Sequence, residues 1–266
     1  MRYSKRKRAT SQRGFSLLEM LMVLVLLSVA VFTVGQVIKV LFPPRAENAS
    51  YERAAVLART TVEQLTRFLQ SAAPNTLRVG LGGACIEYLP AVAVTRYLEP
   101  LPTASNGVAA TTTVRFGAPV TLDAAIKHVL VGSQAADEVY SSSSTASRAT
   151  VATVSTEQVS LSATHTFLRA SPAMRVFLAA DPKRVCRVNT SLYLFESYGL
   201  NTGALTAQQG TGTSALMATG LRTSNTLFTI TTAAGSNATV VEVELSLGSD
   251  ADPKTLKRAV AIANAY

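Results

Sequence analysis

The chain has 266 residues and a formal net charge of +9, from 25 Lys and Arg against 16 Asp and Glu. Six of the basic residues lie in the first 14 positions, where there is no acid, so the rest carries 19 basic and 16 acidic residues. This small excess excludes the strongly basic footprint of a nucleic-acid-binding protein. Only two cysteines are present, without a nearby histidine, so no zinc-ligand spacing occurs.

A long apolar segment follows the basic N-terminus. No charged residue occurs from Met20 to Ile38, and a helix of this length crosses a hydrocarbon core of about 30 Å. Glu19 lies at the start of this segment, where a carboxylate at membrane depth costs several kcal/mol unless it has a partner. The sequence therefore predicts a membrane helix with a functional acidic residue and a nearby positive partner.

The order of residues around Glu19 is distinctive. Arg13-Gly14-Phe15-Ser16-Leu17-Leu18-Glu19, followed by the apolar run, resembles the class III signal of type IV prepilins and type II secretion pseudopilins. The resemblance implies that a prepilin peptidase removes the leader 1–14 by cutting between Gly14 and Phe15, and then methylates the Phe15 amino group. It also implies that Glu19 compensates the Phe15 ammonium of a neighbouring subunit during assembly.

Two simpler interpretations of the N-terminus fit less well. A secretory signal peptide has a shorter apolar core and an Ala-x-Ala-like site, whereas this run continues to Lys39 and Pro43-Pro44 without one. A plain membrane anchor explains the length and leaves Glu19 unexplained. The basic residues before the run place that end in the cytoplasm. We expect a single-pass inner-membrane protein with an assembly helix over 15–42, a periplasmic remainder, and later entry into a fibre.

An amphipathic continuation of this helix is predicted over 43–73. Apolar residues recur at spacings of three and four on one stripe, which faces the chain's own domain; they are Ala55, Ala58, Val62, Leu65 and Leu69. Pro74 and Asn75 end the helix. Pro43 and Pro44 predict a kink or short break near the membrane exit.

Residues 74–266 are predicted to form a β-rich globular domain. Val241, Val243, Leu245 and Leu247 alternate with polar residues, as in a strand with one buried face. Further strands are predicted over 76–79, 85–89, 112–116, 126–131, 159–168, 175–178, 185–188, 191–198 and 227–231, with surface loops at 141–147 and 202–214. Strands after one long helix favour an α+β protein with an antiparallel sheet on that helix, the pilin-like fold that the resemblance implies.

Cys85 and Cys186 lie in predicted strands of the segment placed outside the cytoplasm. An oxidising compartment favours a disulfide between them, which we expect to tie an early sheet to a later one, with free thiols as the alternative.

Stretches of the β-rich domain resemble the MshO-type large minor pilins of mannose-sensitive haemagglutinin pili; they are 73–79, 85–90, Arg96-Tyr97, 175–178, Cys186 and 191–195. This resemblance implies a minor pilin at or near the fibre tip that helps to initiate assembly. Its partners would be the prepilin peptidase, other minor and major pilins, and the inner-membrane assembly platform. A J-type minor pseudopilin of type II secretion has the same plan and remains an alternative.

An enzyme is not indicated. The only histidines, His128 and His165, lie in apolar strand-like settings, and no hydrolase, metalloprotease or nucleotide-binding motif occurs. Asp250-Ala251-Asp252 supplies too few carboxylates for a calcium loop. We expect no catalytic residue, cofactor or metal.

An adhesive or DNA-binding tip module is a further alternative. Positive charge is concentrated in one stretch, at Arg169, Arg175, Lys183, Arg184 and Arg187, and could contact phosphate or an anionic surface. Few aromatic residues are interleaved with it. Arginines scattered over strand faces are the simpler interpretation, and nucleic acid is not expected as a partner.

Overall fold

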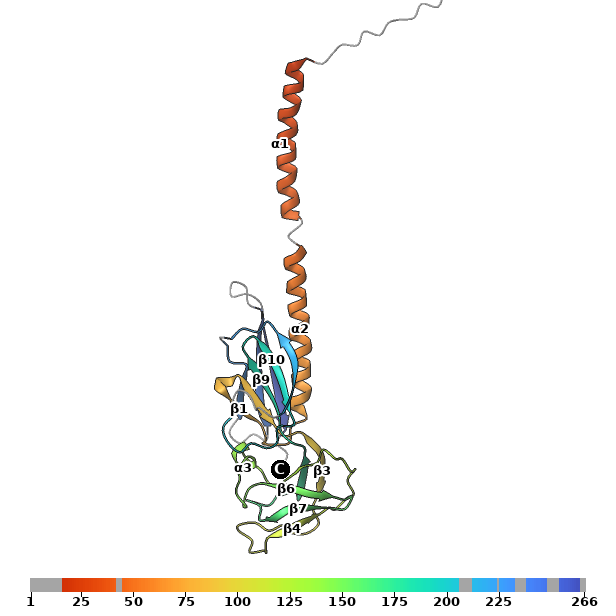
Figure 1. The fold of residues 1–266 in the computed structure, drawn as a ribbon, viewed down its shortest axis with the longest axis vertical. Helices are drawn as coiled ribbons and strands as arrows, with labels where there is room; N and C mark the ends of the chain where they lie inside the picture. Colours follow the sequence, from red (N-terminus) through yellow and green to blue (C-terminus); the bar gives the residue numbers. More distant parts are fainter. Residues whose placement is uncertain are drawn as a thin grey trace, which may run out of the picture. The chain divides into compact units, whose positions relative to one another are not determined.

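The computed structural model describes residues 16–41, 45–205, 212–223, 225–232, 238–247 and 254–263. The chain divides into two compact units, Met1–Tyr51 and Glu52–Tyr266. Figure 1 shows two long helices, α1 (Leu17–Leu41) and α2 (Arg45–Gln70), and a β-rich body around the second one. Pro43 and Pro44, where the sequence predicts a break, lie outside the described residues.

The first helix is apolar on every side. Ser16 precedes it as an N-cap, because its hydroxyl accepts the Leu18 amide (3.3 Å) and its carbonyl accepts those of Glu19 and Met20. The hydroxyls within α1 are satisfied by the helix itself: Ser28 donates to the Val25 carbonyl, and Thr33 to the carbonyls of Val29 and Ala30. The helix therefore exposes no unsatisfied hydroxyl to an apolar surrounding.

The described residues of the body form three antiparallel sheets. Their strands, with two short helices, are β1 (Arg78–Gly80), η1 (Leu81–Gly83), β2 (Cys85–Tyr88), β3 (Ala91–Arg96), β4 (Thr111–Arg115), β5 (His128–Leu130), α3 (Ala136–Val139), β6 (Arg148–Val154), β7 (Gln158–His165), β8 (Arg175–Ala179), β9 (Lys183–Val188), β10 (Ser191–Glu196), β11 (Thr213–Thr219), β12 (Phe228–Thr232), β13 (Ala238–Leu247) and β14 (Lys254–Ala263). The predicted α+β class, with a long N-terminal helix and an antiparallel β-sheet domain, is confirmed.

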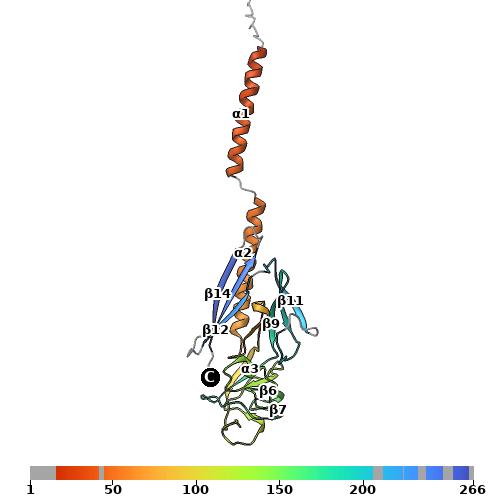
Figure 2. The ribbon, with the colours of Figure 1, turned by 90° about the vertical axis from the view of Figure 1, so that its left-hand side faces the viewer.

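Two of these sheets share a core with α2. Their strand orders are β1-β2-β9-β10-β11 and β12-β13-β14, and Figure 2 shows β14 and β12 on one side of α2 with β9 and β11 on the other. The buried apolar residues of the helix are Ala58, Val62, Leu65 and Leu69, and they pack with apolar residues from both sheets. Ala55, predicted on the same stripe, is exposed. It lies at the edge of the buried arc, and Ala54 packs against the core instead.

The third sheet is inserted between two neighbouring strands of the first. β2 pairs directly with β9, with Cys85 opposite Cys186 and Tyr88 opposite Lys183. Between these strands the chain leaves the sheet and builds six strands in the order β3-β8-β5-β6-β7-β4. This six-stranded part lies beyond the C-terminal end of α2 (Figures 1 and 2).

The inserted sheet closes on itself. Just beyond β3 and β4, Tyr97 pairs with Phe116, while the Leu98 amide donates to the Arg115 carbonyl (3.0 Å) and the Gly117 amide to the Arg96 carbonyl (2.7 Å). The two edge strands are thereby joined, as in a small barrel. Its interior is a second core, which includes Val114, Val129, Val159, Phe167, Val176 and Leu178. We refer to residues 91–179 as the inserted barrel.

Polar and apolar contacts fix the inserted barrel to the end of α2. The Asn75 side-chain amide donates to the Ser133 carbonyl (2.7 Å), and the Ser133 hydroxyl donates to the Pro74 carbonyl (3.2 Å). A small core beneath them combines Ala73 and Leu89 with Leu130, Val139, Tyr140 and Ala179. The inserted barrel is therefore held at several points rather than by its two connections alone.

Every segment predicted as a strand contains one, but four strands were not predicted: β3, β6, β11 and β14. Three of them are rich in Ala, Thr or Ser, whose side chains give little apolar alternation to detect. The fourth, β14, contains three basic residues and a run of exposed positions.

Candidate functional site

Glu19 lies in the first turn of α1 and is exposed. Its carboxylate makes no ion pair with any residue that the structure describes. The first turn of a helix favours a negative charge, because its amide groups are not all paired within the helix. Gly14 and Phe15, the residues of the predicted cleavage and methylation, lie outside the described part, so both steps and the Glu19–Phe15 pairing remain predictions.

The apolar surface of α1 is uncovered from Leu17 to Ile38. Leu17–Ile38 is long and apolar enough to cross a membrane, and none of its most apolar stretch is buried in the protein. Its large apolar side chains, from Leu17 to Ile38, are all more than half exposed. So much contiguous apolar surface requires lipid or other subunits to cover it.

The predicted disulfide is present and confirmed: Cys85 and Cys186 are bonded, with Cα atoms 4.1 Å apart. Its expected place was wrong, because it joins β2 and β9, neighbouring strands of one sheet, rather than two sheets. Both cysteines are fully buried beside Phe195. The bond therefore closes the base of the inserted barrel, whose two connections are the strands that it links.

A buried charged cluster next to the disulfide was not predicted. Glu87 and Arg184 are fully buried and opposite each other, and Arg184 Nη2 donates to Glu87 Oε1 at 2.7 Å. Arg78 binds the other carboxylate oxygen at 2.5 Å, and the Tyr198 hydroxyl donates to Oε1 at 2.8 Å. Burial, and then the Glu87 charge, raise the pKa of Tyr198 far above its ordinary value. The partners are 97 residues apart in sequence, so no local pattern indicates them.

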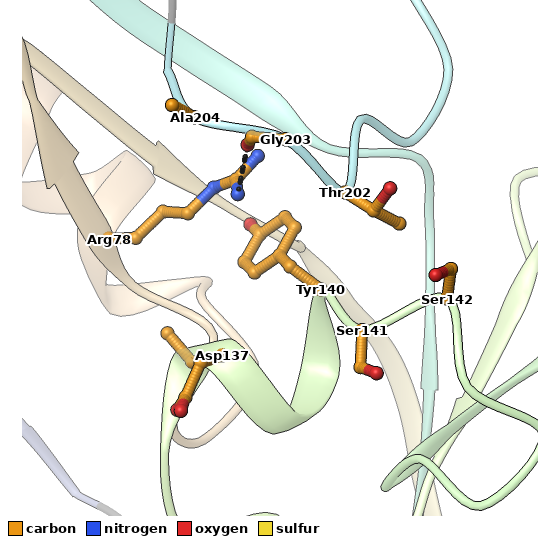
Figure 3. Close-up of a pocket in the computed structure, with 9 residues that line it drawn as sticks. Arg78, Asp137, Tyr140, Ser141, Ser142, Thr202, Gly203 and Ala204 are labelled. Atoms are coloured by element: carbon orange, nitrogen blue, oxygen red, sulfur yellow. Dashed lines mark hydrogen bonds between the residues drawn. The ribbon is translucent and has the colours of Figure 1, made fainter.

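Arg78 also borders a hollow of about 480 Å³, shown in Figure 3. Its guanidinium lies 3.7 Å from the centre of the Tyr140 ring and donates to the carbonyls of Asn201 and Gly203. The Tyr140 hydroxyl points toward Arg78, away from Ser142 and Thr202. Since Arg78 is fully engaged by protein groups, no lining residue that the structure describes offers an unpaired cation here.

The basic stretch that suggested an anionic partner is mostly engaged within the protein. Arg169 pairs with Glu138 at 2.6 Å, Lys183 pairs with Glu196, and Arg184 is buried on Glu87. Arg187 donates to the carbonyls of Arg222, Thr223 and Asn225. Arg175 differs: among the described residues its side chain has no hydrogen-bond or ion-pair partner. The stretch is therefore not a continuous basic surface.

Both histidines are buried in the inserted barrel. His128 Nε2 lies 3.2 Å from Asp181, while Nδ1 lies 3.5 Å from the Arg148 guanidinium. Burial, and then the Arg148 charge, lower the pKa of His128 to about 4. His165 contacts the Ala146 carbonyl at 2.9 Å and the ring of Phe167 edge-on, and burial lowers its pKa too. Both therefore have structural partners and little access to a substrate.

No metal-binding group is found in the described part of the chain, since nowhere there do three His, Cys, Asp or Glu side chains come close enough together. The Asp250 and Asp252 pair lies outside it.

The N-terminal segment matches a known family model. Residues 10–34 match the prokaryotic N-terminal methylation motif. This motif supports a type IV pilin-like or pseudopilin-like subunit. It implies processing by a prepilin peptidase and assembly with other pilins, and with the uncovered apolar helix it fits a pilin anchored in the inner membrane. The match supports a structural protein rather than an enzyme. Comparisons with curated proteins and with solved structures found no match.

Proposed function

We propose that the chain is a minor pilin of a type IV pilus system of the mannose-sensitive haemagglutinin type, incorporated at or near the tip and helping to initiate the fibre. The observation that carries the proposal is the methylation motif at 10–34, which continues into a helix whose large apolar side chains from Leu17 to Ile38 are more than half exposed. Extraction from the membrane would exchange lipid contacts for contacts with the helices of neighbouring subunits.

The inserted barrel supports a position at the fibre end. It lies beyond the C-terminal end of α2 and is fixed there by the Asn75–Ser133 contacts. A rigid extension along the direction of α2 takes up space that a subunit stacked above this one would need. At the tip no such subunit is present, so the extension is tolerated there and obstructs packing elsewhere.

Glu19 has a defined part in this proposal. A carboxylate entering the apolar centre of a fibre needs a positive partner, and the amino group of a neighbour's Phe15 supplies one after cleavage. The predicted periplasmic orientation follows from the basic leader on the cytoplasmic side.

The first test compares Glu19→Ala with Glu63→Ala, a control at an exposed glutamate of α2. Both variants should enter the membrane fraction like the wild type. We expect Glu19→Ala to be at least about tenfold depleted from sheared fibres, the equivalent of losing roughly 1.4 kcal/mol of pairing. Equal recovery of the two variants would count against the pairing.

A second test locates the subunit and identifies its machinery. Gold-labelled antibody against the inserted barrel should mark fibre ends, and label along the shaft would contradict the tip position. Deletion of the gene should reduce surface pili. A deletion strain that keeps its pili and loses protein secretion would instead indicate the J-type pseudopilin.

A further inference from the structure

Two arginines face each other on the outside of the inserted barrel. Arg96 ends β3, Arg175 begins β8, and the two are direct partners in the antiparallel register. Directly opposed residues have Cβ atoms about 5 Å apart, and like charges in this arrangement destabilise a sheet. Neither side chain has an ion-pair or hydrogen-bond partner in the part of the chain that the structure describes. The fold thus places two positive charges together without neutralising them.

The nearest arginine on the adjoining strand shows the ordinary arrangement. Arg115 of β4 pairs with Glu99 at 3.3 Å, and both side chains are largely exposed. Among the described residues, the Arg96–Arg175 pair has no such acid. Both side chains reach solvent, so an anion from solution can supply the counter-charge.

A hollow of about 350 Å³ lies beside the pair. Besides Arg96 and Arg175 it is lined by Val94, Thr95, Gly117 and Ala118. Gly117 contributes no side chain, and the hydroxyl of Thr95 is held on the Ala118 carbonyl (3.2 Å). The volume is at the lower end of the range for small-ligand sites.

The backbone of both arginines is held firmly. The Arg96 carbonyl accepts the Gly117 amide across the barrel closure (2.7 Å). The Arg175 amide donates to the Ser171 hydroxyl (3.1 Å), and Ser171 exchanges backbone hydrogen bonds with the buried Tyr97 hydroxyl. Both arginine side chains therefore extend from fixed backbone positions, so the backbone does not have to be ordered when an anion binds between them.

We propose that Arg96 and Arg175 form a binding site for a compact ligand that carries a carboxylate or a phosphate monoester. Guanidinium groups bind both oxyanions through paired N–H donors. Val94 and Ala118 would contact the apolar part of the ligand. The site does not depend on the role of the chain in a fibre.

A nucleic-acid strand fits this surface less well. Strand binders combine several phosphate contacts with exposed aromatic rings on which bases stack. The aromatic residues next to the pair, Tyr97 and Phe116, are each only 4% exposed and belong to the barrel core. Arg115, which lies across the barrel closure, is already paired with Glu99.

The test is calorimetric titration of the full-length protein in detergent micelles at low salt, with glucuronate, inorganic phosphate and neutral glucose as probes. We expect binding of glucuronate, phosphate or both, and at least about tenfold weaker binding of glucose. The better of the two acids identifies the anionic group. The proposal is overturned if the protein binds neither glucuronate nor phosphate, or if it binds glucose as tightly as it binds these acids.

Variants then assign the binding to these residues. Arg96→Gln and Arg175→Gln should each weaken binding about tenfold, as expected for a lost charge-assisted contact. Arg96→Lys should recover only part of it, because lysine lacks the paired donors. The matched control Arg115→Gln should change affinity less than about twofold. An equal loss in Arg115→Gln would show a diffuse charge effect and overturn the site.

Gly117 provides a test that leaves both arginines intact. A Cβ at this position meets its nearest neighbour, the Arg96 carbonyl, at 3.5 Å, an ordinary contact. Gly117→Ala should therefore bind like the wild type, whereas Gly117→Leu should fill the hollow and weaken binding at least about tenfold. Unchanged binding by Gly117→Leu overturns the hollow as the ligand's place.

Stability separates binding from a structural role. Removing one of two facing like charges relieves repulsion, so Arg96→Gln and Arg175→Gln should unfold at the same or a higher temperature than the wild type. A marked fall would show that the pair supports the fold and would contradict the proposal. Tighter binding of a single-stranded oligonucleotide than of either acid, lost in the same variants, would overturn it in favour of nucleic acid.

Discussion

The two long helices have nearly equal lengths, 25 residues in α1 and 26 in α2, and opposite relations to their surroundings. α1 presents large apolar side chains on every face and buries none of its most apolar stretch. α2 buries a single stripe, with Leu65 fully covered, and leaves its charged faces to solvent. The helical conformation thus depends on surroundings outside the chain in α1 and on the chain's own sheets in α2.

Substitutions in the N-terminal segment and in the body should therefore have different effects. A change in the N-terminal segment should alter processing, insertion or assembly and leave the stability of the body unchanged. A change in the body should alter its free energy of unfolding and leave the membrane step unchanged. A variant that changes both the membrane step and the stability of the body would contradict this division.

Gly14→Val should give the largest effect, an almost complete loss of processing. Glycine lets a backbone approach another surface closely, and a branched side chain beside the bond to be cut prevents this. Mass spectrometry should find the precursor beginning at Met1 instead of a chain beginning at methylated Phe15. The body of this variant should melt like the wild type. Recovery of the shortened chain would contradict the assigned cleavage site.

The double variant Cys85→Ala/Cys186→Ala should give the largest loss of stability in the body. The bond spans 101 residues of sequence, and a loop of about this length contributes up to about 4.7 kcal/mol through the entropy of the unfolded chain. Urea unfolding should show a loss of about 4 kcal/mol with membrane insertion unchanged. An unaltered unfolding midpoint would show that the sheet pairing alone holds the base of the inserted barrel.

The local features of the fold could be predicted from sequence. Helix α1, the stripe of α2, and the alternation of Val241, Val243 and Leu245 depend on neighbours a few positions apart, which hydrophobic periodicity reports. The two cysteines could be paired because they are the only ones in the chain. Their surroundings could not be anticipated.

The features that were missed depend on distant partners. Glu87 and Arg184 look like ordinary exposed charges in sequence, and only the pairing of β2 with β9 buries them together. The same pairing reveals the inserted barrel, because strands more than 90 residues apart prove to be neighbours. The Arg96–Arg175 pair could not be foreseen, since the strand that carries Arg96 is an Ala-Val-Ala-Val stretch that was not recognised.

Leu65→Ala tests the core of α2 against a matched change in α1. Leu65 is fully buried, and replacing such a leucine by alanine costs about 3 kcal/mol through lost burial and the cavity left behind. Leu24, which is 65% exposed in α1, provides the control. The unfolding temperature of the body should be lowered by Leu65→Ala and unchanged by Leu24→Ala. A similar effect of both would mean that α1 also contributes to the body's stability.

The smallest expected effect is a pH dependence that belongs to the body alone. The pKa of His128 is about 4 in the folded protein and about 6.5 in the unfolded chain. The unfolded state therefore binds more protons between these values, and stability falls as pH decreases from about 6.5 to about 4 and levels off below. Between pH 7 and pH 5 the loss should be about 2 kcal/mol, measured by urea unfolding.

His128→Gln should remove most of this slope, because glutamine does not titrate and can still contact Asp181. A weaker slope should remain from His165, whose pKa burial also lowers. The apolar surface of α1 does not change with pH, so membrane retention should be constant from pH 7 to pH 5 in both proteins. A slope unchanged by His128→Gln would assign the acid sensitivity to another group of the body, and loss of membrane retention over the same range would show that α1 and the body respond together.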